Sequence, residues 1–198
     1  RKNNKFDLPK YSFPYICLGD HLSQSGVATG HYFHQDLIVA SNIFEQKPDL
    51  HLDIGSRVDG FITHLISFKQ KTVIGDIRPL NYKNKYISYI KIDLSKNFKS
   101  NQFINKECRK QKYKSVSCLH VIEHMGLGRY GDPINPIGFI SALHNLYDLV
   151  ELNGLLYLSH PVGKTRLEYN AHYVFALDYI YPHIIDCGFE MERIHLID

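Results

Sequence analysis

The stretch HLDIGSRVDGFITHLISFKQKTVIGDIRPL, residues 51–80, sets the architecture of this chain. Two short apolar runs carry Asp53 and Asp76 near their ends, and they flank a segment whose apolar residues recur at helical spacing. A strand, a turn, a helix and a second strand in this order form a βα unit, and such units build parallel sheets covered by helices. The two acids are therefore expected at the ends of neighbouring strands.

The same alternation continues toward the C-terminus. Short apolar runs with branched or small residues predict three more strands, in residues 87–94, 114–122 and 155–162. Between the last two of these, residues 135–154 show helical spacing, and Gly154 is expected to end the helix. The tail predicts a helix or loop, a turn at Gly188 and a final strand.

Residues 30–44 predict a helix that covers the sheet, and the residues before them predict an N-terminal arm. A length of 198 residues suits one domain. We therefore expect a single α/β domain over residues 1–198 with a Rossmann-like, doubly wound, mostly parallel sheet. Residues 1–49 would supply the arm and covering helix, and residues 50–198 the core.

Composition excludes several classes of protein. Hydrophobic residues make up 44% and charged residues 22% of the chain, which is typical of globular proteins. A net charge of +3 is too small to indicate a nucleic-acid partner, and the basic residues 106–114 are interpreted as a solvated surface segment. The chain has no apolar run long enough to span a membrane and no signal-peptide pattern, so we expect a cytoplasmic protein.

The strand ends predict a nucleoside site. Ligands of doubly wound sheets bind where the carboxyl ends of the strands meet, and an acid about 20 residues after the first turn often contacts ribose hydroxyls. Asp76 follows Asp53 by 23 positions, and Asp93 ends the third predicted strand. Gly55 and Ser56 shape the first turn, but it has too few glycines to hold a pyrophosphate. The alternative is that these residues only build turns and caps.

Two further polar clusters follow the fourth and fifth predicted strands. The first comprises His120, Glu123, His124, Arg129, Tyr130 and Asp132, and the second comprises His160, Lys164, Arg166, Asn170 and His172. Because both clusters follow parallel strands, they are expected at the same edge of the sheet as the nucleoside site.

These passages carry a resemblance to known proteins. The order of elements resembles the class I S-adenosylmethionine-dependent methyltransferases, although Arg57 and Asp59 stand where glycines are usual. The passages DIGSRVDGF, DIRPL, CLHVIEHMGLGRYGDP and PVGKTRLEYNAH resemble a methyltransferase-like family of unknown function, first defined from nematode sequences and also found among bacterial surface-polysaccharide genes. The resemblance implies methyl transfer to a small molecule or saccharide. It implies S-adenosylmethionine as cofactor, bound by Asp53, Gly55, Ser56, Asp76, Ile77, Asp93, Leu94 and His120.

Methyl transfer to a hydroxyl needs a base, and His124 is the first candidate because histidine accepts protons near neutral pH. Glu123 or Asp132 is expected to orient it, and His160 and His172 are its rivals. The residues expected to bind the acceptor are Arg129, Tyr130, Lys164, Arg166 and Asn170, whose arginines suit a phosphate or carboxylate.

Other interpretations remain open for the same residues. His124 is alternatively a structural histidine, and Arg129 alternatively pairs with Asp132 in a rigid turn. A metal site at His120 and His124 is disfavoured because a strand-to-loop junction does not place them on one face. The aromatic residues Tyr11, Tyr15, Tyr32 and Phe33 are expected to pack the N-terminal arm, with a base-stacking platform as the alternative. At the level of function, the alternatives are a non-catalytic binding module, or a sugar-modifying or hydrolytic enzyme that uses the His, Glu and Asp cluster.

Overall fold

A five-stranded parallel sheet lies at the centre of the protein in a computed structural model, which describes residues 16–26, 28–96 and 111–197. The strands are β1 (His51–Ile54), β2 (Thr72–Asp76), β3 (Ile87–Lys91), β4 (Tyr113–Leu119) and β5 (Val150–Ser159), in the order β3-β2-β1-β4-β5. The strand order reverses between β1 and β4, so the carboxyl ends of these two strands mark the topological switch point. The predicted α/β fold class is confirmed.

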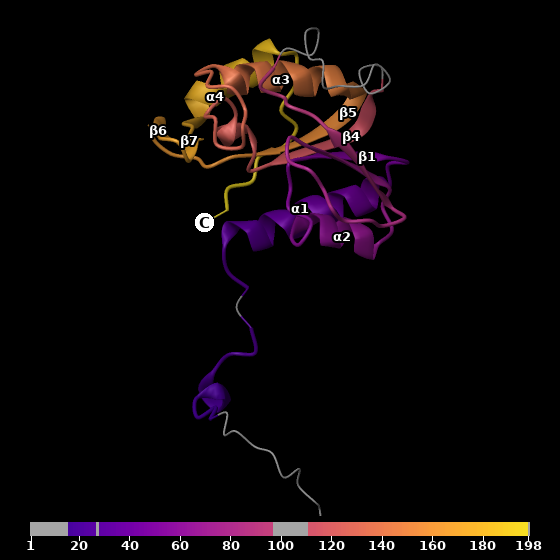
Figure 1. Ribbon diagram of the computed structural model, residues 1–198, viewed down its shortest axis with the longest axis vertical. Helices are drawn as coiled ribbons and strands as arrows, with labels where there is room; N and C mark the ends of the chain where they lie inside the picture. The colour runs from indigo at the N-terminus through magenta and orange to yellow at the C-terminus, as the bar shows by residue number, and fades with distance from the viewer. Residues whose placement is uncertain (1–15, 27, 97–110, 198) are drawn as a thin grey trace, which may run out of the picture.

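Helices cover both faces of this sheet. They are α1 (His31–Gln46), α2 (Phe61–Ser67), α3 (Gly138–Leu149) and α4 (Leu177–Asp186). Figure 1 shows α1 and α2 on one face and α3 and α4 on the other. The arm before α1 contains a short 3-10 turn, η1 (Asp20–Leu22), and extends away from the sheet (Figure 1), which confirms the predicted arm and covering helix.

The sheet is buried on both sides because each face meets helices. All four residues of β1 are buried, with Leu52 and Ile54 in the core that α3 covers. On the opposite face, Val39 and Ile43 of α1 lie four positions apart, one turn along the helix, and pack with Ile62 of α2. A strand that is covered on both faces is usually a nearly continuous apolar run, but in β1 the buried polar residues His51 and Asp53 alternate with Leu52 and Ile54.

The junction between α3 and β5 differs from the prediction. The helix ends at Leu149 and the strand begins at Val150, so Gly154 lies within β5 instead of ending a helix. Pairing with β4 jumps from Tyr113↔Val150 to Ser115↔Leu155, which accommodates extra residues of β5 as a bulge. A Cβ on Gly154 would lie 2.9 Å from the carbonyl oxygen of Glu151, so this glycine is required by the bulge.

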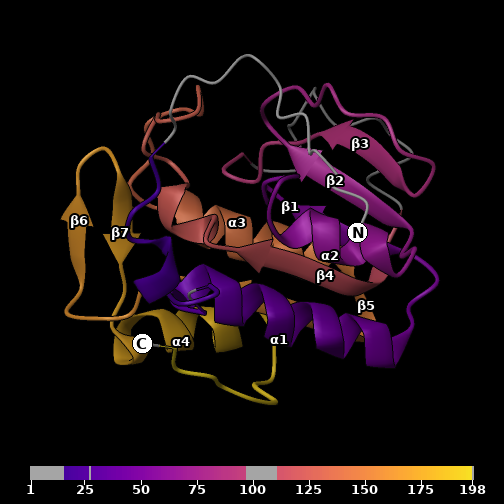
Figure 2. The ribbon, with the colours of Figure 1, turned by 90° about the horizontal axis from the view of Figure 1, so that it is seen from below.

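Two features beyond β5 were also unexpected. A short hairpin, β6 (Arg166–Glu168) and β7 (His172–Val174), follows the sheet, and Figure 2 shows it at the same end of the molecule as the start of α1. The predicted final strand is wrong, because the residues after Gly188 up to 197 form no strand. Their apolar side chains, such as Ile194 and Leu196, lie exposed and pair with no neighbouring strand, so alternation alone did not produce one.

Some predictions lie outside the described residues, namely those for Tyr11, Tyr15 and most of the basic segment 106–114. Tyr32 and Phe33 are described, and they are 55% and 45% exposed, so they are not packed under the arm as predicted. Within the described parts of the chain, no helix is long and apolar enough to cross a bilayer.

Candidate functional site

A pocket lies at the carboxyl ends of β1 to β4, at the switch point of the sheet. Six of the residues predicted to bind the cofactor line it, namely Gly55, Asp76, Ile77, Asp93, Leu94 and His120. The opposite wall comes from the segment after β4 and includes His124, Tyr130 and Asp132. The structure therefore brings together the strand-end residues and four of the six residues of the first polar cluster, whereas Glu123 and Arg129 lie beside the pocket lining.

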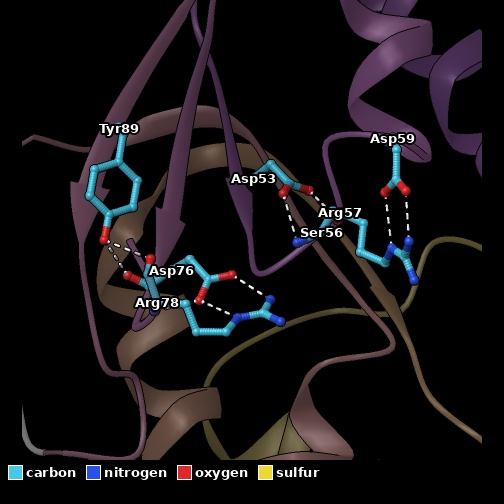
Figure 3. Close-up of polar contacts among 7 residues, drawn as sticks. All are labelled: Asp53, Ser56, Arg57, Asp59, Asp76, Arg78 and Tyr89. Carbon is cyan, nitrogen blue, oxygen red and sulfur yellow. Dashed lines mark hydrogen bonds and ion pairs between the residues drawn. The ribbon is translucent and has the colours of Figure 1, made fainter. Parts of the chain in front are cut away.

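Asp53 does not line this pocket. It pairs in register with Ile74, two residues before Asp76, and two residues correspond to roughly 7 Å along a strand. Its side chain is fully buried and accepts hydrogen bonds from the Ser56 amide (3.1 Å), the Ser56 hydroxyl (2.8 Å) and the Ser117 hydroxyl (2.6 Å). The contacts between Asp53 and Ser56, which Figure 3 shows, thus connect the end of β1 to the first turn.

A buried polar chain continues from Asp53 toward the middle of the sheet. The Ser117 hydroxyl donates to Asp53, so the Ser117 oxygen can accept a hydrogen bond from His51 Nε2, which lies 2.9 Å away. The other ring nitrogen, His51 Nδ1, lies 2.8 Å from the Ser115 hydroxyl. These roles fit a neutral imidazole, because burial lowers the pKa of His51 to about 3. Burial also raises the pKa of Asp53 to about 6, against the opposite effect of its hydrogen bonds. His51, Ser115 and Ser117 were not predicted as part of the site. The signal that could have indicated them is the alternation of polar and apolar residues in β1 and β4.

Asp76 lies at the pocket but already has a partner. Arg78 Nε donates to its Oδ1 at 3.0 Å and an Arg78 terminal nitrogen donates to its Oδ2 at 2.7 Å, which is a bidentate ion pair (Figure 3). The Arg78 guanidinium also lies 4.8 Å from the ring centre of Tyr130. Arg78 therefore connects the end of β2 to the opposite wall of the pocket. This role was not predicted from the sequence.

The first turn contains a single glycine with a required conformation. Gly55 has φ +74°, and a Cβ there would lie 2.9 Å from the side chain of Val121. Arg57 and Asp59, which occupy the positions where glycines are usual, form an exposed ion pair with each other at 2.6 Å (Figure 3). At Gly55, therefore, the backbone of the turn packs closely against Val121 in the segment after β4.

The segment after β4 places two histidines beside a buried carboxylate. It begins at His120, a non-glycine residue with φ +52°, and continues into the 3-10 turn η2 (Ile122–His124). His120 Nδ1 lies 3.0 Å from Glu123 Oε1, whereas the His124 Nε2 to Glu123 Oε1 distance is 3.9 Å. Glu123 therefore orients His120 and not, as predicted, His124.

A backbone carbonyl orients His124 instead. His124 Nδ1 lies 2.6 Å from the carbonyl oxygen of Ala171 in the β6–β7 connection. A carbonyl only accepts, so Nδ1 carries the proton and Nε2 keeps its lone pair. Burial lowers the pKa of His124, although Glu123 acts in the opposite direction, and the imidazole is neutral at pH 7. Ala171 could not be predicted from the sequence, because any residue type supplies the same carbonyl.

Asp132 holds the loop that forms the opposite wall. Its carboxylate accepts hydrogen bonds from the amides of Gly126 (2.9 Å), Gly128 (3.2 Å) and Tyr130 (3.1 Å). It does not pair with Arg129, whose guanidinium donates to Ala171 O at 3.0 Å. The alternative reading of a rigid turn is supported, but with backbone amides in place of the arginine.

The second polar cluster contributes less to the pocket than predicted. His172 lies near His124, with ring centres 6.3 Å apart, while the His160 ring packs edge-on against Phe175 at 5.5 Å. Three predicted acceptor-binding residues lie on or beside the hairpin and do not line the pocket, namely Lys164, Arg166 and Asn170. Arg166 forms an ion pair with Glu168. Among the described residues, no three His, Cys, Asp or Glu side chains are arranged to hold a metal ion.

The fold is similar to those of solved methyltransferases. An O-methyltransferase family protein from Burkholderia thailandensis matches with a TM-score of 0.59 and 8% identity, over 82% of this chain and 52% of that one. Human N-acetylserotonin methyltransferase, in complex with SAM, matches with a TM-score of 0.54 and 10% identity, over 80% of this chain and 47% of that one. The chain thus spans about half the length of these proteins, and identities this low show the fold alone.

Sequence comparison gives a narrower result. No curated protein matches the chain. A family model does match, over residues 63–191, which is roughly two thirds of the chain. The chain therefore belongs to the family described as "Caenorhabditis protein of unknown function, DUF268".

Proposed function

We propose that residues 1–198 form one methyltransferase-like domain that transfers a methyl group from S-adenosylmethionine to a hydroxyl of a small molecule or saccharide. The observation that carries this proposal is the pocket at the switch point, which has strand-end acids on one wall and a neutral histidine on the other. The similarity of the fold to methyltransferases supports it. A cytoplasmic role in surface-polysaccharide biosynthesis is part of the proposal, as the gene context in the sequence resemblance implies.

The wall formed by β2 and β3 suits an adenosyl group. Asp76 would supply carboxylate oxygens for ribose hydroxyls, and Asp93, which also lines the pocket, would accept from the adenine amino group in addition to its contacts with Ser95 and Lys96. Ile77 and Leu94 offer apolar surface to the flat base. Gly55 allows the first turn to approach a ligand closely, because it carries no side chain. When bound, S-adenosylmethionine supplies an electrophilic methyl group.

The opposite wall supplies a base. His124 Nε2 has a lone pair because Nδ1 donates to Ala171, and the buried imidazole remains neutral at pH 7. It is therefore suited to take the proton of an acceptor hydroxyl. The Ala171 carbonyl then stabilises the resulting imidazolium through the same hydrogen bond. Positioning of the two substrates would supply much of the rate.

Calorimetry with S-adenosylmethionine tests the cofactor assignment. We expect micromolar binding to the wild-type protein and a loss of at least tenfold in Asp76→Ala, because the ribose would lose its charged hydrogen-bond acceptor. Asp59→Ala removes an exposed carboxylate outside the pocket and serves as the matched control. If Asp76→Ala and Asp59→Ala bind the cofactor equally well, Asp76 does not hold the ribose.

The bidentate Arg78–Asp76 pair favours a second candidate, a binding module that keeps the fold without using the cofactor. In that case both carboxylate oxygens serve only to hold Arg78 across the pocket. No binding of S-adenosylmethionine at millimolar concentration, to the wild type or to Arg78→Ala, would support this candidate. Binding by either protein would exclude it.

A further inference from the structure

We propose that the acceptor is an anionic hydroxy compound, whose carboxylate or phosphate is bound by Arg129 next to the hydroxyl that faces His124. The proposal rests on the proposed function, because it names the substrate class of the same pocket. Three features of the structure carry it, namely the charge of Arg129, its position relative to His124 and the aromatic rings around them.

Arg129 differs in its partners from three other arginines that lie in the described part of the chain. Arg57, Arg78 and Arg166 each pair with a carboxylate at 2.6 to 2.7 Å. In the described residues, by contrast, no carboxylate forms an ion pair with Arg129, and its guanidinium donates a hydrogen bond to the carbonyl oxygen of Ala171. A guanidinium has five N–H donors, so Arg129 keeps a full positive charge and donors for an anion.

The position of Arg129 fixes where that anion binds. Arg129 Nη1 and His124 Nδ1 donate to the same atom, Ala171 O, at 3.0 and 2.6 Å. The guanidinium and the imidazole are therefore neighbours, held by one point of the β6–β7 connection. Nε2 lies across the imidazole ring from Nδ1, so an acceptor that reaches past the edge of this ring would carry its anionic group at Arg129 and its hydroxyl at Nε2.

Aromatic rings surround this position and suit a ring-shaped acceptor. Tyr130 lines the pocket, and the Arg129 guanidinium lies 5.2 Å from its ring centre. On the α1 side, Tyr32 is 55% exposed, and its ring centre lies 5.0 Å from that of His120. Burial raises the pKa of the Tyr32 hydroxyl, Tyr130 adds to this effect, and the nearby charge of Arg129 acts in the opposite direction. The exposure of Tyr32 is explained if it packs against a bound acceptor.

His124 Nε2 is placed to take the proton that the proposed transfer step releases. The acceptor oxygen would form a bond to the methyl carbon of the donor, the carbon–sulfur bond of the donor would break with its electron pair left on sulfur, and the hydroxyl proton would move to His124 Nε2. Arg129 takes no proton, because its guanidinium stays charged throughout. It is a binding residue for the acceptor and offsets the negative charge that develops on the oxygen.

The test is a binding titration without cofactor, followed by the histidine ring signals and the arginine side-chain signals in NMR spectra. The probes are glucuronate and glucose 6-phosphate, with neutral glucose as their matched control. We expect at least one anion to bind the wild type tenfold or more tightly than glucose, since a hydrogen bond between two charged groups is stronger than one to a neutral hydroxyl. Preference for glucuronate or for glucose 6-phosphate identifies the anion as carboxylate or phosphate.

Variants then locate the effect. Arg129→Ala is expected to lose roughly 10- to 100-fold in affinity for the anion and little for glucose, whereas Arg129→Lys recovers part of the loss. Arg193→Ala removes the same charge from the exposed tail and serves as the control. Equal binding of anions and glucose by the wild type, or equal anion affinity in Arg129→Ala and Arg193→Ala, overturns the proposal. Both outcomes are independent of cofactor binding, so they separate this proposal from the proposed function.

Discussion

Replacing Asp53 with Asn tests how a buried carboxylate beneath the pocket affects stability. Burial raises the pKa of Asp53 from 3.8 to about 6, so between these pH values the folded protein keeps a proton that the unfolded chain has released. The stability that this group contributes is fully present below pH 3.8 and is lost as the pH rises through 6. The shift in the pKa of Asp53 corresponds to about 3 kcal/mol in the free energy of unfolding, of which about 2 kcal/mol is lost between roughly pH 4.5 and 7.5.

Asparagine has no carboxyl proton to lose at this site. Its amide oxygen accepts from the Ser56 amide as Asp53 does, and its NH₂ group donates to the Ser117 hydroxyl. From about pH 4.5 to 7.5, the free energy of unfolding of Asp53→Asn should therefore rise by about 2 kcal/mol relative to the wild type.

Urea unfolding followed by circular dichroism at the two pH values measures this difference. Asp59→Asn is the control, because this carboxylate is exposed and its pKa lies below its ordinary value, outside the tested range. If the difference in the free energy of unfolding between Asp53→Asn and the wild type stays constant within about 0.5 kcal/mol, Asp53 of the folded protein does not titrate between these two pH values.

Three further outcomes are expected. His124→Ala should lower kcat/KM for a hydroxyl acceptor by roughly 100-fold or more, because it removes the proposed base. In the wild type, kcat/KM should fall only when the pH drops below the ordinary histidine pKa, since burial lowers the pKa of His124 and protonation removes the lone pair of Nε2. Gly126→Ala should cost roughly 3 kcal/mol or more in urea unfolding, since φ is +82° and its Cβ would collide with the carbonyl of Asn135. Ile62→Ala, at a fully buried position, should cost about 2–5 kcal/mol, whereas Leu152→Ala, at a 92% exposed one, should change stability by at most about 0.5 kcal/mol.

Much of the pocket was predictable because the sheet is parallel. Parallel strands place all their carboxyl ends at one edge, so residues that follow different strands meet there whatever their separation in sequence. Asp76, Asp93, His120 and His124 follow this rule, and all of them line the pocket. The rule needs only strand ends, which apolar runs indicate well.

Depth along a strand was harder to predict. Asp53 and Asp76 both look like strand-end acids, but the register places Asp53 beside Ile74, below the edge of the sheet. Its neighbour at alternate spacing, His51, is also polar and buried. Two polar residues on the same face of a strand indicate an internal hydrogen-bonded chain, and this signal was present in the sequence.

Contacts between loops were not predictable. Sequence spacing does not show that Arg78 bends back onto Asp76, nor that the carbonyl of Ala171 reaches His124 from a hairpin 47 positions later. Such contacts depend on the path of the connecting segments, for which apolar periodicity carries no information. The orientation of the proposed base is therefore a result of the structure alone.

Tyr130 connects the two halves of the pocket physically. Arg78, which occupies the Asp76 carboxylate, and Arg129, which lies beside His124, both place their guanidinium groups within about 5 Å of its ring. Under the proposed function, ribose hydroxyls would compete with Arg78 for the oxygens of Asp76, and displacement of Arg78 would remove one of the two cations from Tyr130. Arg129 would then be the remaining cation at that ring, so filling the cofactor half of the pocket would change the surroundings of the acceptor half.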